Sequence, residues 1–185
     1  MELALHLDEL PGFVNKVQIQ QKAQGLYDNI YKLYYYSVGK LPLKRFEWGC
    51  NGYVAANGAI LGLAYQLTKD KKYLTAAHSA FDYLLGRNSL DYCFITRFGS
   101  RYPKRIHDRR SHSDGITMPL PGYLVGGPNL DQPTDCGQSS YPSSIYPARA
   151  YLDEFCSFST NEIAINWNAP FVMLVGAIIE SSKNN

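Results

Sequence analysis

Apolar residues recur at helical spacing in four segments of the chain. In residues 17–36 they alternate at steps of four and three, which places them on one face of a helix, and residues 54–67 repeat the pattern. A third apolar face runs from an N-cap at Asp70 to a stop at Gly86. A last helix is predicted for residues 170–180, because proline fits the first turn of a helix. No stretch alternates apolar and polar residues with period two, so the sequence predicts an all-α fold.

Residues 88–159 lack this periodicity. They hold seven of the ten prolines and no long amphipathic stretch. Loops of this length inside a compact domain are uncommon unless they carry function. We therefore expect the loops to gather at one end of antiparallel helix pairs, as the wall of a cleft in a helical toroid.

Composition narrows the class of protein. A chain of 185 residues with 45% hydrophobic and 18% charged residues is long enough to bury the core of one globular domain. The net charge of +2 gives no reason to expect a nucleic-acid partner. No apolar run approaches the roughly 20 residues that a membrane span needs, so no membrane association is expected. Residues 1–8 have neither a basic region nor an uninterrupted apolar segment, so this chain is not expected to carry a signal peptide.

Cysteine and tyrosine usage adds two observations. The four cysteines show no C-x-x-C spacing, which argues against a zinc knuckle and leaves their disulfide state open. The fifteen tyrosines outnumber the eight phenylalanines. Aromatic faces that also carry a hydroxyl suit a wet groove lined by sugar, although tyrosine is also ordinary packing material.

Two acids stand out just ahead of the last predicted helix. Asp153 and Glu162 lie nine residues apart among aromatic side chains. A carboxyl group against an aromatic wall loses solvation, which favours its protonated form. Such an acid can protonate the leaving oxygen of a glycosidic bond. The alternative is that Glu162 caps or salt-bridges the next helix, and the residues by themselves favour that alternative.

The spacing around these acids resembles the active-site signature of glycoside hydrolase family 9, which consists mostly of endoglucanases. The matching positions are Tyr151, Asp153, Phe158, Glu162, Ala164, Asn168 and Ala169. Glu162 stands where the family has its general acid, and Asp153 stands at the second acidic position of the signature. The resemblance therefore implies that both are catalytic.

A second segment, residues 93–109, resembles the histidine signature of the same family. The resemblance implies that His107 belongs to the catalytic cleft and hydrogen-bonds sugar hydroxyls, and that Arg109 and Arg110 help to hold the chain. A basic phosphate-binding loop is the first alternative, but acidic residues are interleaved and no glycine-rich cradle follows. A metal site is the second, with four candidate ligands: His107, Asp108, His112 and Asp114. The resemblance argues against metal ligation.

Shorter segments extend the resemblance over most of the chain. Residues 48–51 and 82–88 are similar to family segments, and residues 121–129 resemble a glycine-rich loop near the rim of the active site, with tight turns as an equal alternative. Trp48 and Trp167 are candidate stacking platforms for sugar, although a place in the core is the commoner fate of tryptophan.

The resemblance implies that residues 1–185 are the C-terminal portion of a catalytic domain, an (α/α)6 toroid with long active-site loops. The expected activity is hydrolysis of β-1,4-glucosidic bonds in cellulose or a related β-glucan, with inversion. Inversion needs a second carboxylate about 6.5–9.5 Å from the acid. Nothing in the chain matches the base segment of the family, so the base is expected in a missing N-terminal part.

The alternative to an enzyme is a non-catalytic remnant that binds a β-glucan polysaccharide or oligosaccharide. For the full-length protein the resemblance implies an extracellular location. Calcium is common in the family, its ligands here are unassigned, and no other cofactor is expected.

Overall fold

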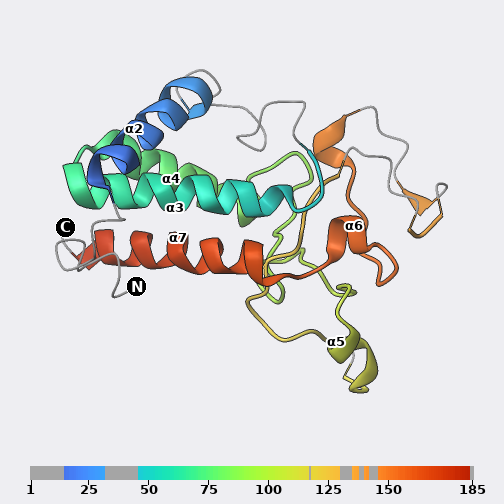
Figure 1. Cartoon of the computed structure of the whole chain (residues 1–185). Coiled ribbons are helices and arrows are strands. Elements are labelled where there is room, and N and C mark those ends of the chain that lie inside the picture. The colour runs from blue at the N-terminus through green and yellow to red at the C-terminus, as the bar shows by residue number, and fades with distance from the viewer. Residues whose placement is uncertain are drawn as a thin grey trace.

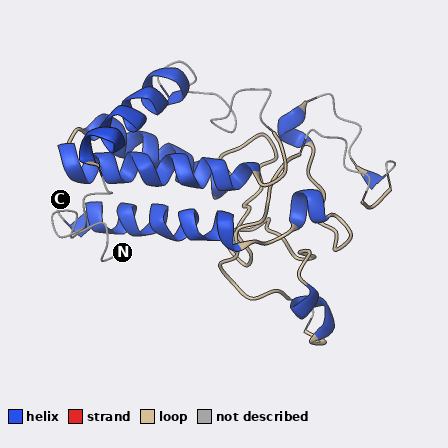
Figure 2. Cartoon of the chain, in the orientation of Figure 1, coloured by secondary structure: helices blue, strands red, loops and turns tan. Residues whose placement is uncertain are grey.

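The computed structural model describes residues 15–31, 46–116, 118–129, 135–137, 140–141 and 146–183, and within them it is helical (Figures 1 and 2). The elements are α2 (Lys16–Leu26), a π-helical turn η1 (Tyr27–Tyr31), α3 (Cys50–Thr68), α4 (Lys71–Leu84), α5 (Arg109–Ser113), a 3₁₀ turn η3 (Pro147–Arg149), α6 (Phe158–Asn161) and α7 (Ile165–Lys183). These residues contain isolated β-bridges but no strand, which confirms the all-α prediction. No helix among them is long and apolar enough to cross a membrane.

The long helices stack on one another and the loops gather at one end. α3 lies in the middle and packs against α2, α4 and α7. In Figure 1 the first residues of α3 and of α7 point to the same side, and the loops, α5 and α6 lie on that side. Figure 2 shows the same division between helix and loop. The loops predicted from residues 88–159 therefore stand at the end of a helical layer, as expected.

The local signals at the helix ends are confirmed. Asp70 caps α4, and its carboxylate accepts a hydrogen bond from the backbone N–H of Lys72. Gly86, just beyond the last residues of α4, has φ of 125°, a backbone conformation that glycine adopts without strain. The helix predicted for residues 17–36 corresponds to α2 and η1 as far as Tyr31, and residues 32–36 lie outside the described residues.

The predicted start of the last helix at Pro170 is wrong, because α7 begins at Ile165 and holds Pro170 in its interior. Proline has no N–H to donate four residues back, which costs the helix one hydrogen bond. Contacts with residues far away in the sequence support the additional turn. The side chain of Asn168 accepts a hydrogen bond from the Leu124 N–H and donates one to the Leu124 carbonyl, and Trp167 is buried.

α3 and α7 approach each other closely because α3 carries glycines on the shared face. A Cβ added to Gly52 would lie 2.5 Å from the Cβ of Trp167, and one added to Gly62 would lie 2.6 Å from the Cβ of Ala177. Both separations are far inside van der Waals contact. The absence of side chains at Gly52 and Gly62 therefore allows α7 to lie close to α3. This close packing fixes the position of the start of α7 and of the residues just before it.

We predict that Gly52→Ala lowers the free energy of unfolding by roughly 1–3 kcal/mol, because the new methyl group overpacks the α3–α7 contact. Alanine would otherwise stabilise a helix relative to glycine by about 1 kcal/mol. The matched control is Gly25→Ala in α2, where no atom lies within 4 Å of the new Cβ, and this variant should be neutral or more stable. Urea unfolding followed by circular dichroism measures both, and equal effects of the two substitutions would contradict the packing argument.

Candidate active site

The two signature segments meet at a backbone bridge between His107 and Glu162. The N–H of His107 donates to the carbonyl of Asn161 at 2.9 Å, and the N–H of Gly126 donates to the carbonyl of Glu162 at 3.0 Å. Glu162 follows α6 directly, and its own N–H bonds the Phe158 carbonyl. The main chain of Glu162 is thus held between the histidine segment and the glycine-rich loop, which brings three of the segments that resemble the family to one place.

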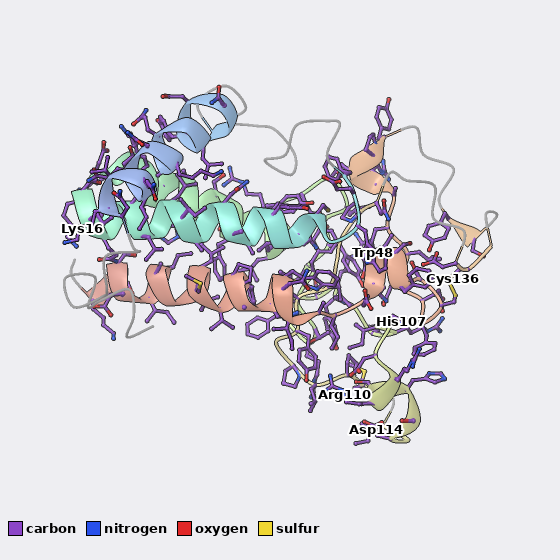
Figure 3. The ribbon with its side chains drawn as sticks, viewed as in Figure 1. Lys16, Trp48, His107, Arg110, Asp114 and Cys136 are labelled. Atoms are coloured by element: carbon purple, nitrogen blue, oxygen red, sulfur yellow. A yellow bond between two sulfur atoms is a disulfide. The ribbon has the colours of Figure 1, made fainter. Side chains whose placement is uncertain are left out.

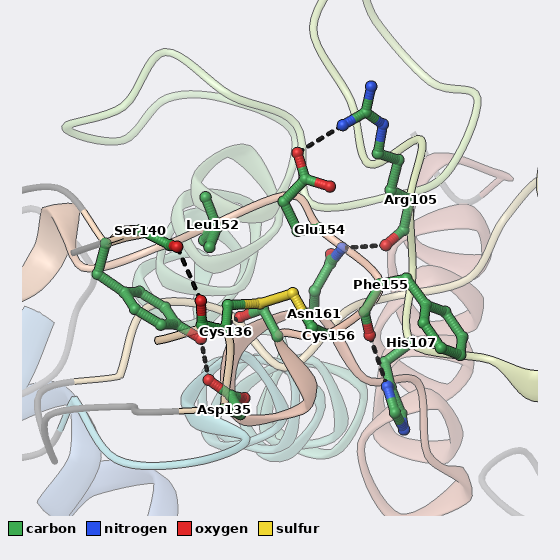
Figure 4. The surroundings of a disulfide bond; sticks show 12 residues. Arg105, His107, Asp135, Cys136, Ser140, Leu152, Glu154, Phe155, Cys156 and Asn161 are labelled. Atoms are coloured by element: carbon green, nitrogen blue, oxygen red, sulfur yellow. Dashed lines mark hydrogen bonds and ion pairs between the residues drawn. A yellow bond between two sulfur atoms is a disulfide. The ribbon is translucent and has the colours of Figure 1, made fainter. Parts of the chain in front are cut away.

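His107 is oriented by the carbonyl of Phe155. Its Nδ1 lies 2.6 Å from that oxygen (Figure 4). A carbonyl oxygen can only accept, so Nδ1 carries a proton, and in the tautomer that this hydrogen bond selects Nε2 is the acceptor. The imidazole is half-buried, and it can accept a hydrogen bond from a hydroxyl group in front of it.

Aromatic rings lie one against the next on both sides of His107, and we call them the aromatic row: Trp48, Phe158, His107, Phe155 and His112. Trp48 lies against Phe158 with ring centroids 5.6 Å apart, and Phe158 lies 5.9 Å from His107. His107 stacks on Phe155 at 4.9 Å, and Phe155 stacks on His112 at 3.9 Å. Trp48 is 49% exposed and Phe158 is 40% exposed, so the near end of the row faces solvent. Figure 3 shows Trp48 and His107 together at the loop end of the molecule.

The two acids of the signature have opposite surroundings. The carboxylate of Asp153 accepts hydrogen bonds from the backbone N–H groups of Lys104 and Arg105 at 2.9 and 3.0 Å, from the Asn161 amide at 2.9 Å and from the Tyr92 hydroxyl at 3.1 Å. Burial raises the pKa of Tyr92, and the negative charge of Asp153 raises it further, so this phenol stays a donor. The carboxylate of Glu162 is partly exposed and makes no hydrogen bond or ion pair with the described residues.

Of the other candidate substrate-binding residues, Trp167 lies in the core, and Arg109 and Arg110 lie on α5. Trp167 is only 7% exposed, and its indole N–H donates to the Leu124 carbonyl at 3.1 Å, so it is a core residue and the expectation of a stacking platform is wrong. Arg109 and Arg110 are exposed on α5, and the Arg110 guanidinium pairs with Asp108 at 3.1 Å. Within the described residues no hydrogen bond or ion pair joins either arginine to Glu162.

A disulfide bond joins Cys136 to Cys156, which lies between Asp153 and Glu162 in the sequence (Figure 4). The spacing of the cysteines had left their disulfide state open. Next to it, the carboxylate of Asp135 accepts hydrogen bonds from the Ser159 N–H and the Tyr141 hydroxyl. Partial burial pushes the pKa of Asp135 upward, but these hydrogen bonds outweigh burial and hold it below its usual value. A bond between distant cysteines depends on the fold, and the sequence carries no signal for it.

The remaining cysteines are free thiols in the core. Cys50 and Cys93 are buried, and burial raises the pKa of both thiols, so neither is poised to react. Among the residues that the structure describes, no three His, Cys, Asp or Glu side chains gather as a metal site. The four candidates His107, Asp108, His112 and Asp114 therefore form no ligand set there, and calcium ligands stay unassigned.

Comparison with known proteins gives one consistent family. Residues 4–175 match the model of the family described as glycosyl hydrolase family 9. The chain is 43% identical over 136 residues to a xyloglucan-specific endo-β-1,4-glucanase of Bacteroides ovatus, and 35% identical over 153 residues to a cellulose 1,4-β-cellobiosidase of Acetivibrio thermocellus. These matches cover 73% and 76% of this chain but 22% and 17% of the relatives. The chain thus spans about a fifth of the length of these curated relatives.

Solved structures agree with the sequence matches. A thermostable endoglucanase of Alicyclobacillus acidocaldarius, a single mutant, superposes with a TM-score of 0.76 at 30% identity, covering 89% of this chain and 31% of that one. A family 9 protein of Bacteroides ovatus gives a TM-score of 0.72 at 33% identity, covering 88% of this chain and 27% of that one. The fold of the described helices is therefore a portion of the (α/α)6 toroid of these neighbours.

We predict that Asp153→Asn destabilises the chain by roughly 2–3 kcal/mol, because one oxygen that accepts hydrogen bonds becomes an amide N–H₂ facing other donors. The matched control is Asp91→Asn. Asp91 is exposed, and its carboxylate oxygen lies 3.9 Å from a guanidinium nitrogen of Arg101. Removing the charge of Asp91 should therefore change the free energy of unfolding by less than about 0.5 kcal/mol. Chemical unfolding measures both variants, and a neutral Asp153→Asn would show that the network does not hold the loop.

Proposed function

The chain belongs to glycosyl hydrolase family 9, and from that premise we propose that it is part of an endo-type enzyme that hydrolyses β-1,4-glucosidic bonds in cellulose or a related β-glucan. One observation carries the proposal. Of the two acids in the signature, Asp153 accepts hydrogen bonds from four protein donors, whereas the carboxylate of Glu162 makes no hydrogen bond or ion pair with the described residues and its backbone pairs with that of His107. An uncommitted carboxyl group is what proton transfer to a substrate requires.

Glu162 acts as the general acid. Its proton passes to the glycosidic oxygen while the bond from that oxygen to the anomeric carbon breaks, and the bonding electrons stay on the leaving oxygen. A water molecule, deprotonated by a base on the opposite face of the sugar, forms the new bond to the anomeric carbon with inversion. Asp153 acts as a positioning residue, because it holds the backbone of residues 104–105 that leads into His107.

The base comes from another part of the same module, which is the missing N-terminal part expected from the sequence. Two facts support this step. The chain spans about a fifth of the curated relatives, and the second acid of its own signature is occupied by hydrogen bonds. An inverting base needs a free carboxylate that holds a water molecule, and Asp153 offers no such free oxygen to it.

Substrate is held by hydrogen bonds and by stacking. His107 accepts a sugar hydroxyl through Nε2, and the exposed faces of Trp48 and Phe158 stack on pyranose rings. Arg109 and Arg110, exposed on α5, donate to hydroxyls farther along the glucan. The disulfide supports an extracellular location for the full-length protein, because such bonds persist in oxidising compartments.

The second candidate function is glucan binding without hydrolysis, as a remnant of such an enzyme. The exposed aromatic row favours it, since stacking platforms bind sugar whether or not a base is present. One measurement distinguishes the two functions: only the enzyme releases reducing ends when the complete module is supplied with glucan.

We predict that Glu162→Gln in the complete module lowers hydrolysis of cellulose derivatives by ~10²–10⁴-fold while binding of cello-oligosaccharides is retained, because glutamine cannot donate the proton. Substrates with very good leaving groups should lose much less, since they need little protonation. Glu180→Gln, near the C-terminal end of α7, is the matched control and should keep full activity. An equal loss on activated and natural substrates would sink the assignment of Glu162 as acid.

We also predict that residues 1–185 alone release no measurable reducing ends from soluble cellulose derivatives, whereas fusion to the preceding part of the module restores turnover. The physical reason is that a proton donor without a base leaves the attacking water unactivated. Folding of the isolated chain is confirmed first by circular dichroism. Robust turnover by the folded chain alone would place the base among its own residues.

A further inference from the structure

Asp135 is a carboxylate outside the two signature segments, and it binds the turn that leads to Glu162. One of its oxygens accepts a hydrogen bond from the Ser159 N–H at 2.8 Å, and the other accepts one from the Tyr141 hydroxyl. Ser159 is the second residue of α6, and Glu162 directly follows that helix. The N–H groups of a first helical turn have no partner inside the helix, so a carboxylate from elsewhere in the chain stabilises the start of α6.

Asp135 also ends a chain of three hydroxyl groups. The Tyr141 hydroxyl lies 2.6 Å from that of Ser157, which lies 2.6 Å from that of Thr160. Partial burial raises the pKa of Asp135, but its hydrogen bonds outweigh burial and keep the carboxyl ionised at neutral pH. An ionised carboxylate only accepts, so the Tyr141 hydroxyl donates to it. The Ser157 hydroxyl then donates to Tyr141 and that of Thr160 to Ser157, so the charge of Asp135 sets the direction of the whole chain.

The disulfide bond holds Asp135 in the position where these hydrogen bonds form. Cys136 follows Asp135 and is joined to Cys156, the residue before Ser157 (Figure 4). Asp135 and Ser159 lie 24 positions apart in the sequence. Bringing distant residues together costs chain entropy, and a cross-link between their neighbours reduces that cost. The disulfide and the carboxylate therefore act together on the segment just before Glu162.

We propose that Asp135, secured by the Cys136–Cys156 disulfide, is a positioning residue for the general acid Glu162. The proposal rests on the proposed function, since it takes Glu162 to be the acid. Asp135 acts through α6, because the N–H of Glu162 bonds the Phe158 carbonyl in the first position of that helix. If α6 shifts, the carboxyl of Glu162 shifts with it, and a misplacement of about 1 Å can slow a reaction ~10²-fold.

Two carboxylates hold α6 from its two ends. Asp153 accepts a hydrogen bond from the Asn161 amide, just before Glu162, whereas Asp135 accepts one from the Ser159 N–H near the start of the helix. The contact with Asp153 stays when Asp135 is replaced. A substitution of Asp135 is therefore expected to loosen the turn without unfolding the loop end.

The test uses the complete module and two substrates that differ in their need for an acid. Cellohexaose has a poor leaving group, whereas dinitrophenyl β-cellobioside has a good one that leaves with little protonation. Asp135→Asn keeps one acceptor oxygen, which can serve Ser159 or Tyr141 but not both. The matched control is Asp70→Asn, because Asp70 likewise accepts the N–H of the second residue of a helix, Lys72 in α4, beyond the end of α3 that is remote from the loops.

We expect Asp135→Asn to lower kcat on cellohexaose about tenfold with KM unchanged, while the dinitrophenyl substrate and the control variant change less than about twofold. In a Glu162→Gln background Asp135→Asn should cause no further loss, because no acid is left to position. The double variant Cys136→Ser with Cys156→Ser keeps Asp135 but frees it from the cross-link. It should show a smaller loss with the same selectivity for cellohexaose.

An equal loss on both substrates, full activity on cellohexaose, or a further loss in the Glu162→Gln background overturns the proposal. Circular dichroism checks folding, and if Asp135→Asn does not fold, the double serine variant decides by the same comparison of substrates. Glu162→Gln alone is measured on both substrates as well. If Glu162→Gln shows no selectivity, the proposed function has failed, whereas selectivity there without selectivity in Asp135→Asn removes the positioning role alone.

Discussion

The hydrogen bonds to the Asp153 carboxylate hold the loop end of this molecule together. Chain segments without regular structure cannot pair their own backbone groups, so polar side chains have to take that role. Asp153 accepts from the backbone N–H groups of Lys104 and Arg105, and Asn161 donates both to this carboxylate and to the Arg105 carbonyl. Since residues 104–105 lead into His107 and Asn161 precedes Glu162, one polar cluster sets the relative position of the imidazole and the acid.

The loops are tied in turn to the rigid helices. The glycine-rich loop bonds the first turn of α3, where the Asn51 N–H donates to the Gly126 carbonyl and the Asn51 amide donates to the Val125 carbonyl. From the other side, Asn168 and Trp167 of α7 bond Leu124 in the same loop. Because glycines bring α3 and α7 close together, the loop between their ends has little freedom. A site built of loops thereby gains the precision that catalysis demands.

The signature contains two carboxylates in one short segment, and their environments separate their roles. Asp153 is surrounded by donors, whereas the carboxylate of Glu162 makes no hydrogen bond or ion pair with the described residues. The aromatic row runs from Trp48 past His107, whose backbone pairs with that of Glu162, to Phe155 and His112.

Features that depend on neighbours along the chain were accessible from the sequence by itself. The helices α3 and α4, the Asp70 cap and the Gly86 stop follow from spacing and short-range hydrogen bonding, whereas the two signature segments were recognised by their resemblance to a known family. Only the tertiary structure decided that Trp167 is core, that α7 begins at Ile165, that Cys136 pairs with Cys156 and that Asp153 is fully engaged. Each of these depends on a partner distant in the sequence, such as Leu124 or Lys104, and periodicity carries no record of which distant groups the fold will bring together.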